Sequence, residues 1–234
     1  MQRRALLTTS MILGLTACAD KPALIEAATA KPSASSSTTL WFIFLERGRA
    51  TPDDKAAVAA MQRGHIENFK RLFAEKKLFS AGPLRDPSGF KRGIVIAQAA
   101  TRDALQRYFD PDEYVREGYM SVNASPAQAM RALHVEGIDP DGIEESRILL
   151  LGRPTQEAAP ELALRRRAHL QLLLDQGQIG AWYRLASGPI AEVLFARTKD
   201  NAALQAALAG YPGVADKSVS LEIWPQWLGK GVLR

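Results

Sequence analysis

The amino-acid sequence predicts an α+β fold made of two tandem ferredoxin-like repeats, each with the element order βαββαβ. Two observations support this prediction. The second half of the chain is similar to the first half at a nearly constant spacing. Both halves also show the same succession of short apolar runs and amphipathic stretches. Residues 1–39, which precede both repeats, differ from them in composition, and this composition predicts the compartment of the folded part.

The internal similarity is clearest around two histidines. A shift of 104 positions places Gly48-Arg49 on Gly152-Arg153 and His65 on His169 without a gap. Further along the chain the shift is 99, and it matches Ala97 with Ala196, Ala104-Leu105-Gln106 with Ala203-Leu204-Gln205, and Val115 and Ser121 with Val214 and Ser220. Chance rarely supplies such identities beside the same order of predicted elements.

In the first repeat, the apolar run at 40–45 predicts a strand, and Thr51-Pro52 predicts the start of a helix. Apolar side chains recur every three or four residues along this helix, so they form a buried stripe that includes His65. Further strands are predicted at 78–81, 93–97 and 119–123, and a second helix at 102–109.

The second repeat follows the same order. Its strands are predicted at 147–151, 193–196 and 218–224, and its helices at 161–175 and 201–209. A βαββαβ unit leaves one face of its sheet apolar on the side away from its helices, and two such sheets packed face to face bury both faces. We therefore expect domains at 40–137 and 145–234 that pack sheet-on-sheet as an intrachain pseudo-dimer of the dimeric α/β-barrel type.

Residues 1–17 have the composition of an export signal peptide. Arg3 and Arg4 form a positive start, and the mostly apolar stretch 5–17 is too short to cross a bilayer as a helix. It ends in Leu15-Thr16-Ala17-Cys18, which resembles the lipobox of bacterial lipoproteins. The resemblance implies cleavage before Cys18, diacylglycerol on its sulfur and an acylated new N-terminus carrying a fatty acid such as palmitate. The arginine pair fits either Sec or Tat export.

Residues 18–39 are expected to form a flexible tether, because small polar residues and prolines bury too little surface to fold. The folded part is then held by lipid on a bacterial membrane, inner or outer, and faces the periplasm. Cys18 is the only cysteine in 234 residues, so no disulfide is expected. The net charge of +5 falls to +3 when the two arginines of the signal peptide leave, so nucleic acid is not an expected partner. The oligomeric state stays open.

Three segments of the first repeat carry a resemblance to the YCII-related domain family. They are His65, the strand end Leu78-Phe79-Ser80-Ala81-Gly82-Pro83, and Asp112 with Gly118 six positions later. The family has proline directly after this aspartate, whereas this chain has Glu113; Asp110, which does precede a proline, is the alternative. The resemblance covers about 40–123 and implies a ferredoxin-like dimer whose histidine and aspartate are proposed as a catalytic dyad.

A histidine paired with a carboxylate suits reactions that move a carbon-bound proton. Neutral imidazole accepts a proton near neutral pH, and the carboxylate beside it fixes the tautomer and stabilises the imidazolium. His65 and Asp112 are therefore the candidate catalytic residues of an isomerase or lyase that acts on a small molecule. The alternative is a non-catalytic ligand-binding or envelope-accessory lipoprotein, because a half-buried histidine bonded to one acid is common without catalysis.

The second repeat keeps His169 but has Tyr211-Pro212 where the first has Asp112-Glu113. We therefore expect one site, with the second repeat as its structural partner. This second repeat resembles muconolactone isomerase and its relatives, mostly in architecture.

Other charged residues are weaker candidates. Arg165-Arg166-Arg167 could contact an anion, although a charged helix face is more often solvated. Arg49 and Arg153 recur at strand ends, where they could bind a carboxylate or hold a turn. The three histidines of the chain, including His134, are too far apart in sequence to suggest a metal site, so neither a metal nor a cofactor is expected.

Replacing Cys18 tests the expected anchor. Because its thiol is the only acceptor for the lipid, Cys18→Ala should abolish incorporation of radiolabelled palmitate and block cleavage of the signal peptide at this position. Gel autoradiography of cells that express either form measures both effects. Equal labelling of the two forms would contradict the lipobox interpretation.

Overall fold

The computed structural model describes residues 38–138, 142–155 and 159–233. The expected signal peptide, Cys18 and nearly all of the expected tether lie outside the described residues. Within the described part, no helix combines the length and the apolar character that are needed to cross a membrane.

Both halves of the folded part follow the order strand, helix, strand, strand, helix, strand. The first half contains β1 (Thr39–Arg47), α1 (Lys55–Ala74), β2 (Leu78–Pro83), β3 (Lys91–Ala99), α2 (Arg102–Gln106), the 3-10 turn η1 (Arg107–Phe109), α3 (Glu113–Arg116) and β4 (Met120–Arg131). The second half contains β5 (Ile143–Gly152), α4 (Pro160–Asp175), β6 (Ala181–Leu185), β7 (Ile190–Ala196), α5 (Asn201–Ala209) and β8 (Leu221–Gly229). The second helical region of the first half is therefore divided into three short pieces.

The start of α1 differs from the sequence prediction. The helix begins at Lys55 rather than directly after Thr51. Its cap is the Asp54 side chain, whose Oδ1 accepts the amide hydrogens of Ala56 and Ala57 at 2.8 and 3.2 Å. Two successive acids follow the proline, and the second of them satisfies the free amides at the helix start.

All eight strands belong to one antiparallel sheet with the order β2-β3-β1-β4-β6-β7-β5-β8. β4 joins the two halves, because residues 120–126 pair with β1 and residues 127–131 pair with β6. The sequence prediction contained neither the second part of β4 nor β6. The two sheets that we expected to pack face to face are thus parts of one continuous sheet.

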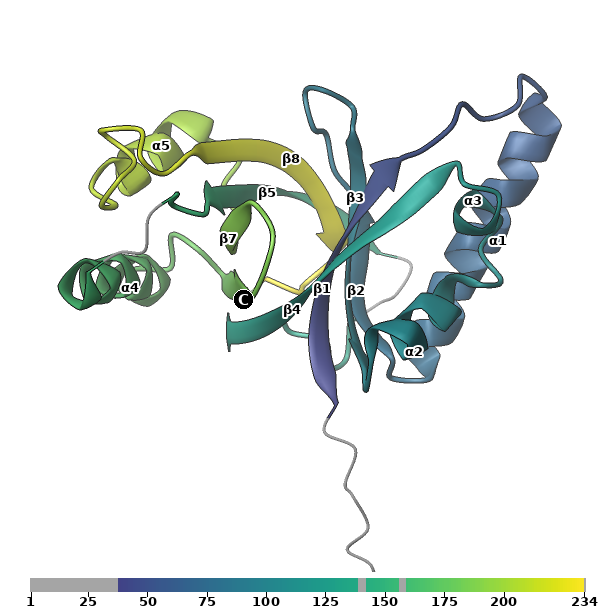
Figure 1. Cartoon of the computed structure of the whole chain (residues 1–234), viewed down its shortest axis with the longest axis horizontal. Coiled ribbons are helices and arrows are strands. Elements are labelled where there is room, and N and C mark those ends of the chain that lie inside the picture. The colour runs from purple at the N-terminus through teal and green to yellow at the C-terminus, as the bar shows by residue number, and fades with distance from the viewer. Residues whose placement is uncertain (1–37, 139–141, 156–158, 234) are drawn as a thin grey trace, which may run out of the picture. The chain divides into compact units, whose positions relative to one another are not determined.

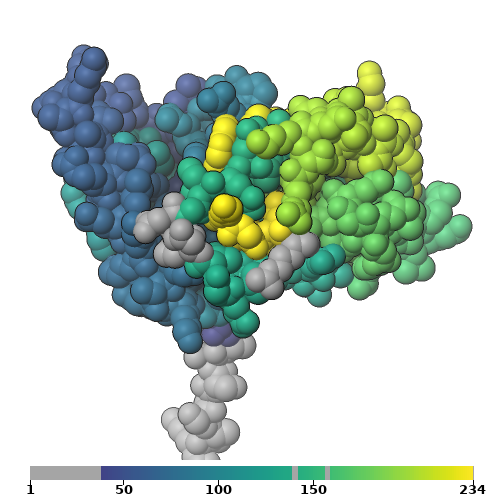
Figure 2. Space-filling view, turned by 180° about the vertical axis from the view of Figure 1, so that it is seen from behind, coloured from purple at the N-terminus to yellow at the C-terminus, as the bar shows by residue number. Residues whose placement is uncertain are grey.

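The two edge strands of this sheet, β2 and β8, meet and close it into a barrel. Leu84 forms an isolated antiparallel bridge with Gln226, and the Arg85 amide donates to the Pro225 carbonyl at 2.9 Å. The helices lie outside the strands (Figure 1). In the space-filling view, the yellow C-terminal residues lie between the blue first half and the green second half (Figure 2).

Three apolar clusters fill this fold. One lies inside the barrel and takes side chains from both halves, among them Phe42, Phe195 and Trp224. The second packs between the first-half strands and α1 and α2, and the third between the second-half strands and α4 and α5. Because the inner cluster is shared, neither half covers the inner face of its own strands without the other.

Gly82 and Pro83 end β2 at the point where the barrel closes. A Cβ atom on Gly82 would overlap the backbone carbonyl of Trp227, so only glycine lets β8 pass this closely. The Leu84 amide donates to the Arg92 carbonyl, so in the alternating antiparallel pattern the Pro83 nitrogen faces away from β3, on the side where β8 approaches. Proline at this position therefore costs no hydrogen bond between β2 and β3.

Adding one methyl group at the closure should destabilise the whole barrel. Gly82→Ala forces β8 away from β2 and should lower the free energy of unfolding by about 1–3 kcal/mol, the usual cost of overpacking. Gly64→Ala is the matched control: a Cβ there meets nothing within 4 Å, and alanine in the middle of α1 should stabilise the helix by about 0.5–1 kcal/mol. Urea unfolding followed by tryptophan fluorescence measures both, and equal stability of the two variants would contradict the proposed closure.

Candidate functional site

His65 lies on the buried stripe of α1, as the sequence predicts. The buried residues of this helix are Met61, His65, Asn68 and Leu72, three or four positions apart, and they turn the histidine toward the protein interior. The His65 residue is 8% exposed, so its ring is nearly enclosed but still accessible from one side.

Asp112 caps the short helix α3 and faces His65 from there. Its Oδ1 accepts the Tyr114 amide at 3.1 Å, and its Oδ2 lies 2.5 Å from His65 Nδ1. The residue is fully buried, so these two contacts supply hydrogen bonds that a buried carboxylate needs. Of the two aspartates considered from the sequence, Asp112 contacts the histidine, whereas Asp110 is exposed at the end of η1.

The contact with Asp112 determines which edge of the imidazole is available. An ionised carboxylate only accepts hydrogen bonds, so His65 Nδ1 carries the proton that it donates to Asp112. In the neutral ring, Nε2 then keeps its lone pair and lies on the side of the ring away from Nδ1. His65 also lines a cavity, and Nε2 is the ring nitrogen that the contact with Asp112 does not occupy.

Two aromatic rings hold the imidazole in place. The Phe69 ring centroid lies 4.3 Å from that of His65, and the Tyr114 ring stands edge-on to it at 5.6 Å. The Tyr114 hydroxyl donates to the Val58 carbonyl at 3.4 Å, at the start of α1. Burial raises the pKa of the Tyr114 phenol, and the positive charge of Arg92 opposes this shift. Both rings restrict rotation of His65 and exclude water from its faces.

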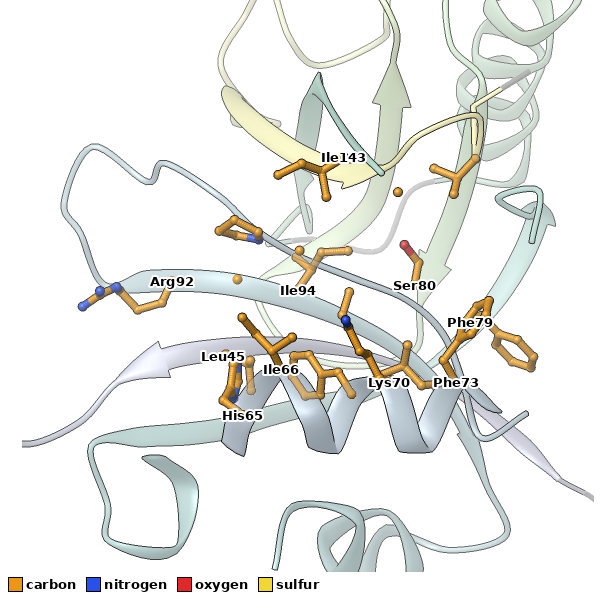
Figure 3. A pocket seen from close by; sticks show the side chains of 18 of the residues that line it. Leu45, His65, Ile66, Lys70, Phe73, Phe79, Ser80, Arg92, Ile94 and Ile143 are labelled. Carbon is orange, nitrogen blue, oxygen red and sulfur yellow. The ribbon is translucent and has the colours of Figure 1, made fainter. Parts of the chain in front are cut away.

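A cavity of about 650 Å³ adjoins His65, between α1, β2 and the ends of β5 and β8 (Figure 3). Most of the lining is apolar and includes Leu45, Ile66, Phe69, Phe73, Phe79 and Ile94. The polar side chains in the lining, besides His65, are those of Gln62, Lys70, Ser80 and Arg92. A concave, mostly apolar space with a few polar groups is typical of a small-molecule site.

The second half of the chain supplies one wall of this cavity. Ile143 at the start of β5, Gly229 at the end of β8, and Val232 all line it, together with Ile138 in the connection between the halves. The site therefore depends on barrel closure, even though the candidate catalytic pair belongs to the first half alone. No local pattern in the sequence predicts this wall, because Ile143 and Val232 line the cavity only after the two edge strands come together.

The second half has a histidine at the matching helix position, and among the described residues no acid forms a hydrogen bond or ion pair with it. His169 Nε2 lies 2.9 Å from the Ala207 carbonyl, and the Tyr211 ring stands edge-on to the imidazole at 5.9 Å. Tyr211, which aligns with Asp112 in the sequence comparison of the two halves, therefore lies beside His169 as Asp112 lies beside His65. His169 is held by a backbone group, so the asymmetry expected from the sequence is present in the structure.

The arginines considered from the sequence have structural partners or face solvent. Arg49 Nε donates to the Glu117 carbonyl at 2.6 Å, and Arg153 Nε donates to the Gly188 carbonyl at 2.8 Å, so both hold turns. Arg166 Nε donates to the Pro212 carbonyl at 2.9 Å, while Arg165 and Arg167 are exposed. In the described ranges, no group of three His, Cys, Asp or Glu side chains could hold a metal ion.

Sequence reasoning missed one buried acid, Glu192 on β7. Its Oε2 accepts the Trp182 indole hydrogen at 2.6 Å, and its Oε1 accepts from Arg184 Nε at 3.0 Å. Burial raises the pKa of the Glu192 carboxyl, and the hydrogen bond from Trp182 and the charge of Arg184 oppose that shift. Burial of the Tyr211 phenol, together with the charge of Glu192, raises the pKa of Tyr211 to about 12. In the second half the buried acid is therefore on a strand, where Trp182 and Arg184 donate hydrogen bonds to it.

The barrel fold has counterparts among solved structures. No family model matches the chain, and no curated protein matches it. A candidate monooxygenase from Fusobacterium nucleatum is similar, with a TM-score of 0.50 and 10% identity over 84% of this chain and 96% of that one. A candidate chlorite dismutase is also similar, with a TM-score of 0.51 and 12% identity over 83% of this chain and 95% of that one. At these identities the likeness concerns the fold, an α+β barrel of the dimeric α/β-barrel type.

The buried acid Glu192 should make stability depend on pH. Its folded-state pKa is raised above 4.5, so the folded protein holds this proton more tightly than the unfolded chain does. Relative to Glu192→Gln, the wild type should therefore lose stability as the pH rises from 4.5 through the raised pKa. Urea midpoints measured from pH 4 to pH 8 give this difference. Glu222→Gln, at an exposed position of β8, should show no such trend, and parallel curves for both variants would contradict the assignment.

Proposed function

We propose that this chain is a membrane-anchored lipoprotein of the bacterial envelope whose cavity binds a small molecule and moves a proton on it. The chemistry is of the isomerase or lyase type, with His65 as the base and then the acid. The single observation that carries the proposal is the buried His65–Asp112 contact at 2.5 Å beside a cavity that His65 itself lines.

The geometry fits each step of such a reaction. His65 Nε2 takes a proton from a carbon next to an electron-withdrawing group, and the electron pair of the broken C–H bond moves into the ligand. Asp112 stabilises the resulting imidazolium, because it already accepts the Nδ1 hydrogen. Return of the proton to another carbon completes an isomerisation. Departure of a leaving group with its electron pair from the neighbouring carbon completes an elimination.

The proposal also covers the family relationship of the two halves and the cellular location of the protein. The first half is proposed as a YCII-related domain and the second as a related repeat, with support from the shared element order and the matching helix positions of His65 and His169. Cys18 is the proposed lipid attachment site, with the folded part on the periplasmic side. Nothing in this scheme requires nucleic acid or a cofactor.

Solvent exchange tests the proton transfer without knowledge of the true substrate. In D2O, the full-length protein should introduce deuterium into at least one member of a panel of apolar ring ketones, lactones and β-halo ketones, followed by proton NMR. His65→Gln should abolish this exchange. Asp112→Asn should slow it by about 10²-fold, the lower range for the contribution of acid–base groups.

His169→Gln is the matched control for this experiment. It alters the equivalent helix histidine, whose partner is the Ala207 carbonyl and which has no acid partner in the described part of the chain, and should leave the exchange rate unchanged. If compounds bind in the cavity but none exchanges faster with wild type than with His65→Gln, catalysis by this pair is wrong. The non-catalytic binding module then becomes the better account.

A further inference from the structure

The charged side chains in the lining of the cavity are cationic. Its lining includes the cationic side chains of Lys70 and Arg92, and His65 becomes cationic when it takes a proton. Among the lining residues that the structure describes, none is an aspartate or glutamate. The Asp112 carboxylate lies behind His65, and Lys70 has an interaction partner of its own, so attraction of an anionic ligand depends on Arg92.

Arg92 lies at the His65 end of the cavity (Figure 3). It is close enough to act electrostatically on Tyr114, whose ring stands edge-on to His65. Within the described part of the chain, no hydrogen bond or ion pair engages its guanidinium. Arg92 is exposed, and its side chain extends outward at the His65 end of the cavity (Figure 3), so its guanidinium can form the paired hydrogen bonds that a carboxylate accepts at the rim.

The rim of the cavity is apolar and open to solvent. Ile66 on α1 is 44% exposed, and Ile143 on β5 is 67% exposed, yet both also line the cavity. Large aliphatic side chains on either side of a mouth favour an apolar ligand, because its entry removes their surface from water. A sugar or another heavily hydrated molecule would lose its water here without enough polar groups to replace it.

One polar group lies deeper in the apolar lining. The Ser80 residue is 6% exposed, and its hydroxyl points into the space between β2 and Ile143 (Figure 3). In the described residues no side chain or backbone group forms a hydrogen bond with this hydroxyl. Because this hydroxyl opens on the cavity, water or a ligand can pair with it, and a ligand that displaces the water without a polar group of its own would leave it unsatisfied. It is suited to a carbonyl or hydroxyl on the body of the ligand.

These features together narrow the ligand class. We propose that the cavity binds apolar monoanions: molecules with a body of more than one ring and a single carboxylate held by Arg92 near His65. This inference rests on the proposed function, since it takes the His65 cavity as the site. The apolar body lies between the rim residues Ile66 and Ile143, and the anionic group lies at the Arg92 end.

Three naphthalene probes of matched shape test the class. Equilibrium dialysis is performed with the full-length protein in phospholipid nanodiscs, with empty nanodiscs subtracted. 2-Naphthoate should bind at least tenfold more tightly than 2-naphthalenemethanol, and 2-naphthylmethylammonium should bind most weakly. Equal affinity for the three probes, or no binding of naphthoate, would overturn the proposal.

Two variants separate the charge from the apolar contact. Arg92→Gln should weaken naphthoate binding by at least fivefold and naphthalenemethanol binding by less than twofold. Ile143→Asn should weaken both probes by similar factors. Arg165→Gln, at an exposed position on α4, is the matched control and should change neither. An equal loss of both probes in Arg92→Gln would show that this arginine does not hold the anion.

The outcomes distinguish this inference from the proposed function. Naphthoate preference without any deuterium exchange would keep the ligand class and refute the catalytic role of His65. Exchange on neutral compounds without naphthoate preference would keep the proton transfer and refute the ligand class.

Discussion

The pairing of β4 with strands of both halves is the interaction on which the remaining structure depends. One strand continues from the edge of the first half into the edge of the second, so the two sets of strands share hydrogen bonds as well as an apolar interior. This continuity brings β2 and β8 together, and that closure places Ile143 and Val232 opposite α1. The cavity beside His65 is a consequence of barrel closure rather than a property of the first half.

The two halves use the same framework differently. The first half places an acid at the start of a short helix, where Asp112 serves as helix cap and as partner of His65. The second half has Tyr211 at that place, and its buried acid, Glu192, lies on a strand beside Trp182. A buried carboxylate needs donors wherever it lies, so each half surrounds its acid with hydrogen bonds. In the first arrangement the histidine lines a cavity.

The sequence predicted the features that local patterns determine. The helix at 201–209 was predicted with its observed bounds, and the stripe of α1 placed His65 on its buried side. The choice of Asp112 over Asp110 rested on family spacing, and the contact agrees with it. β6 was missed because five residues that include Arg184 give no clear alternation. The sequence did not predict that Ile143 lines the cavity. The other lining residues come close to it through pairing of strands far apart in the sequence, and the periodicity of apolar residues carries no information about such pairing.

The position of β1 has a mechanical consequence. It is the first strand after residue 38, yet it lies in the sheet interior between β3 and β4, with hydrogen bonds along both of its edges. A pull along the chain from its N-terminal end would load these two rows of bonds in parallel, so many must break at once before the strand slides. A strand at the edge of the sheet would present only one such row. If lipid holds the preceding residues, drag on the folded part would therefore be resisted at one of its strongest points.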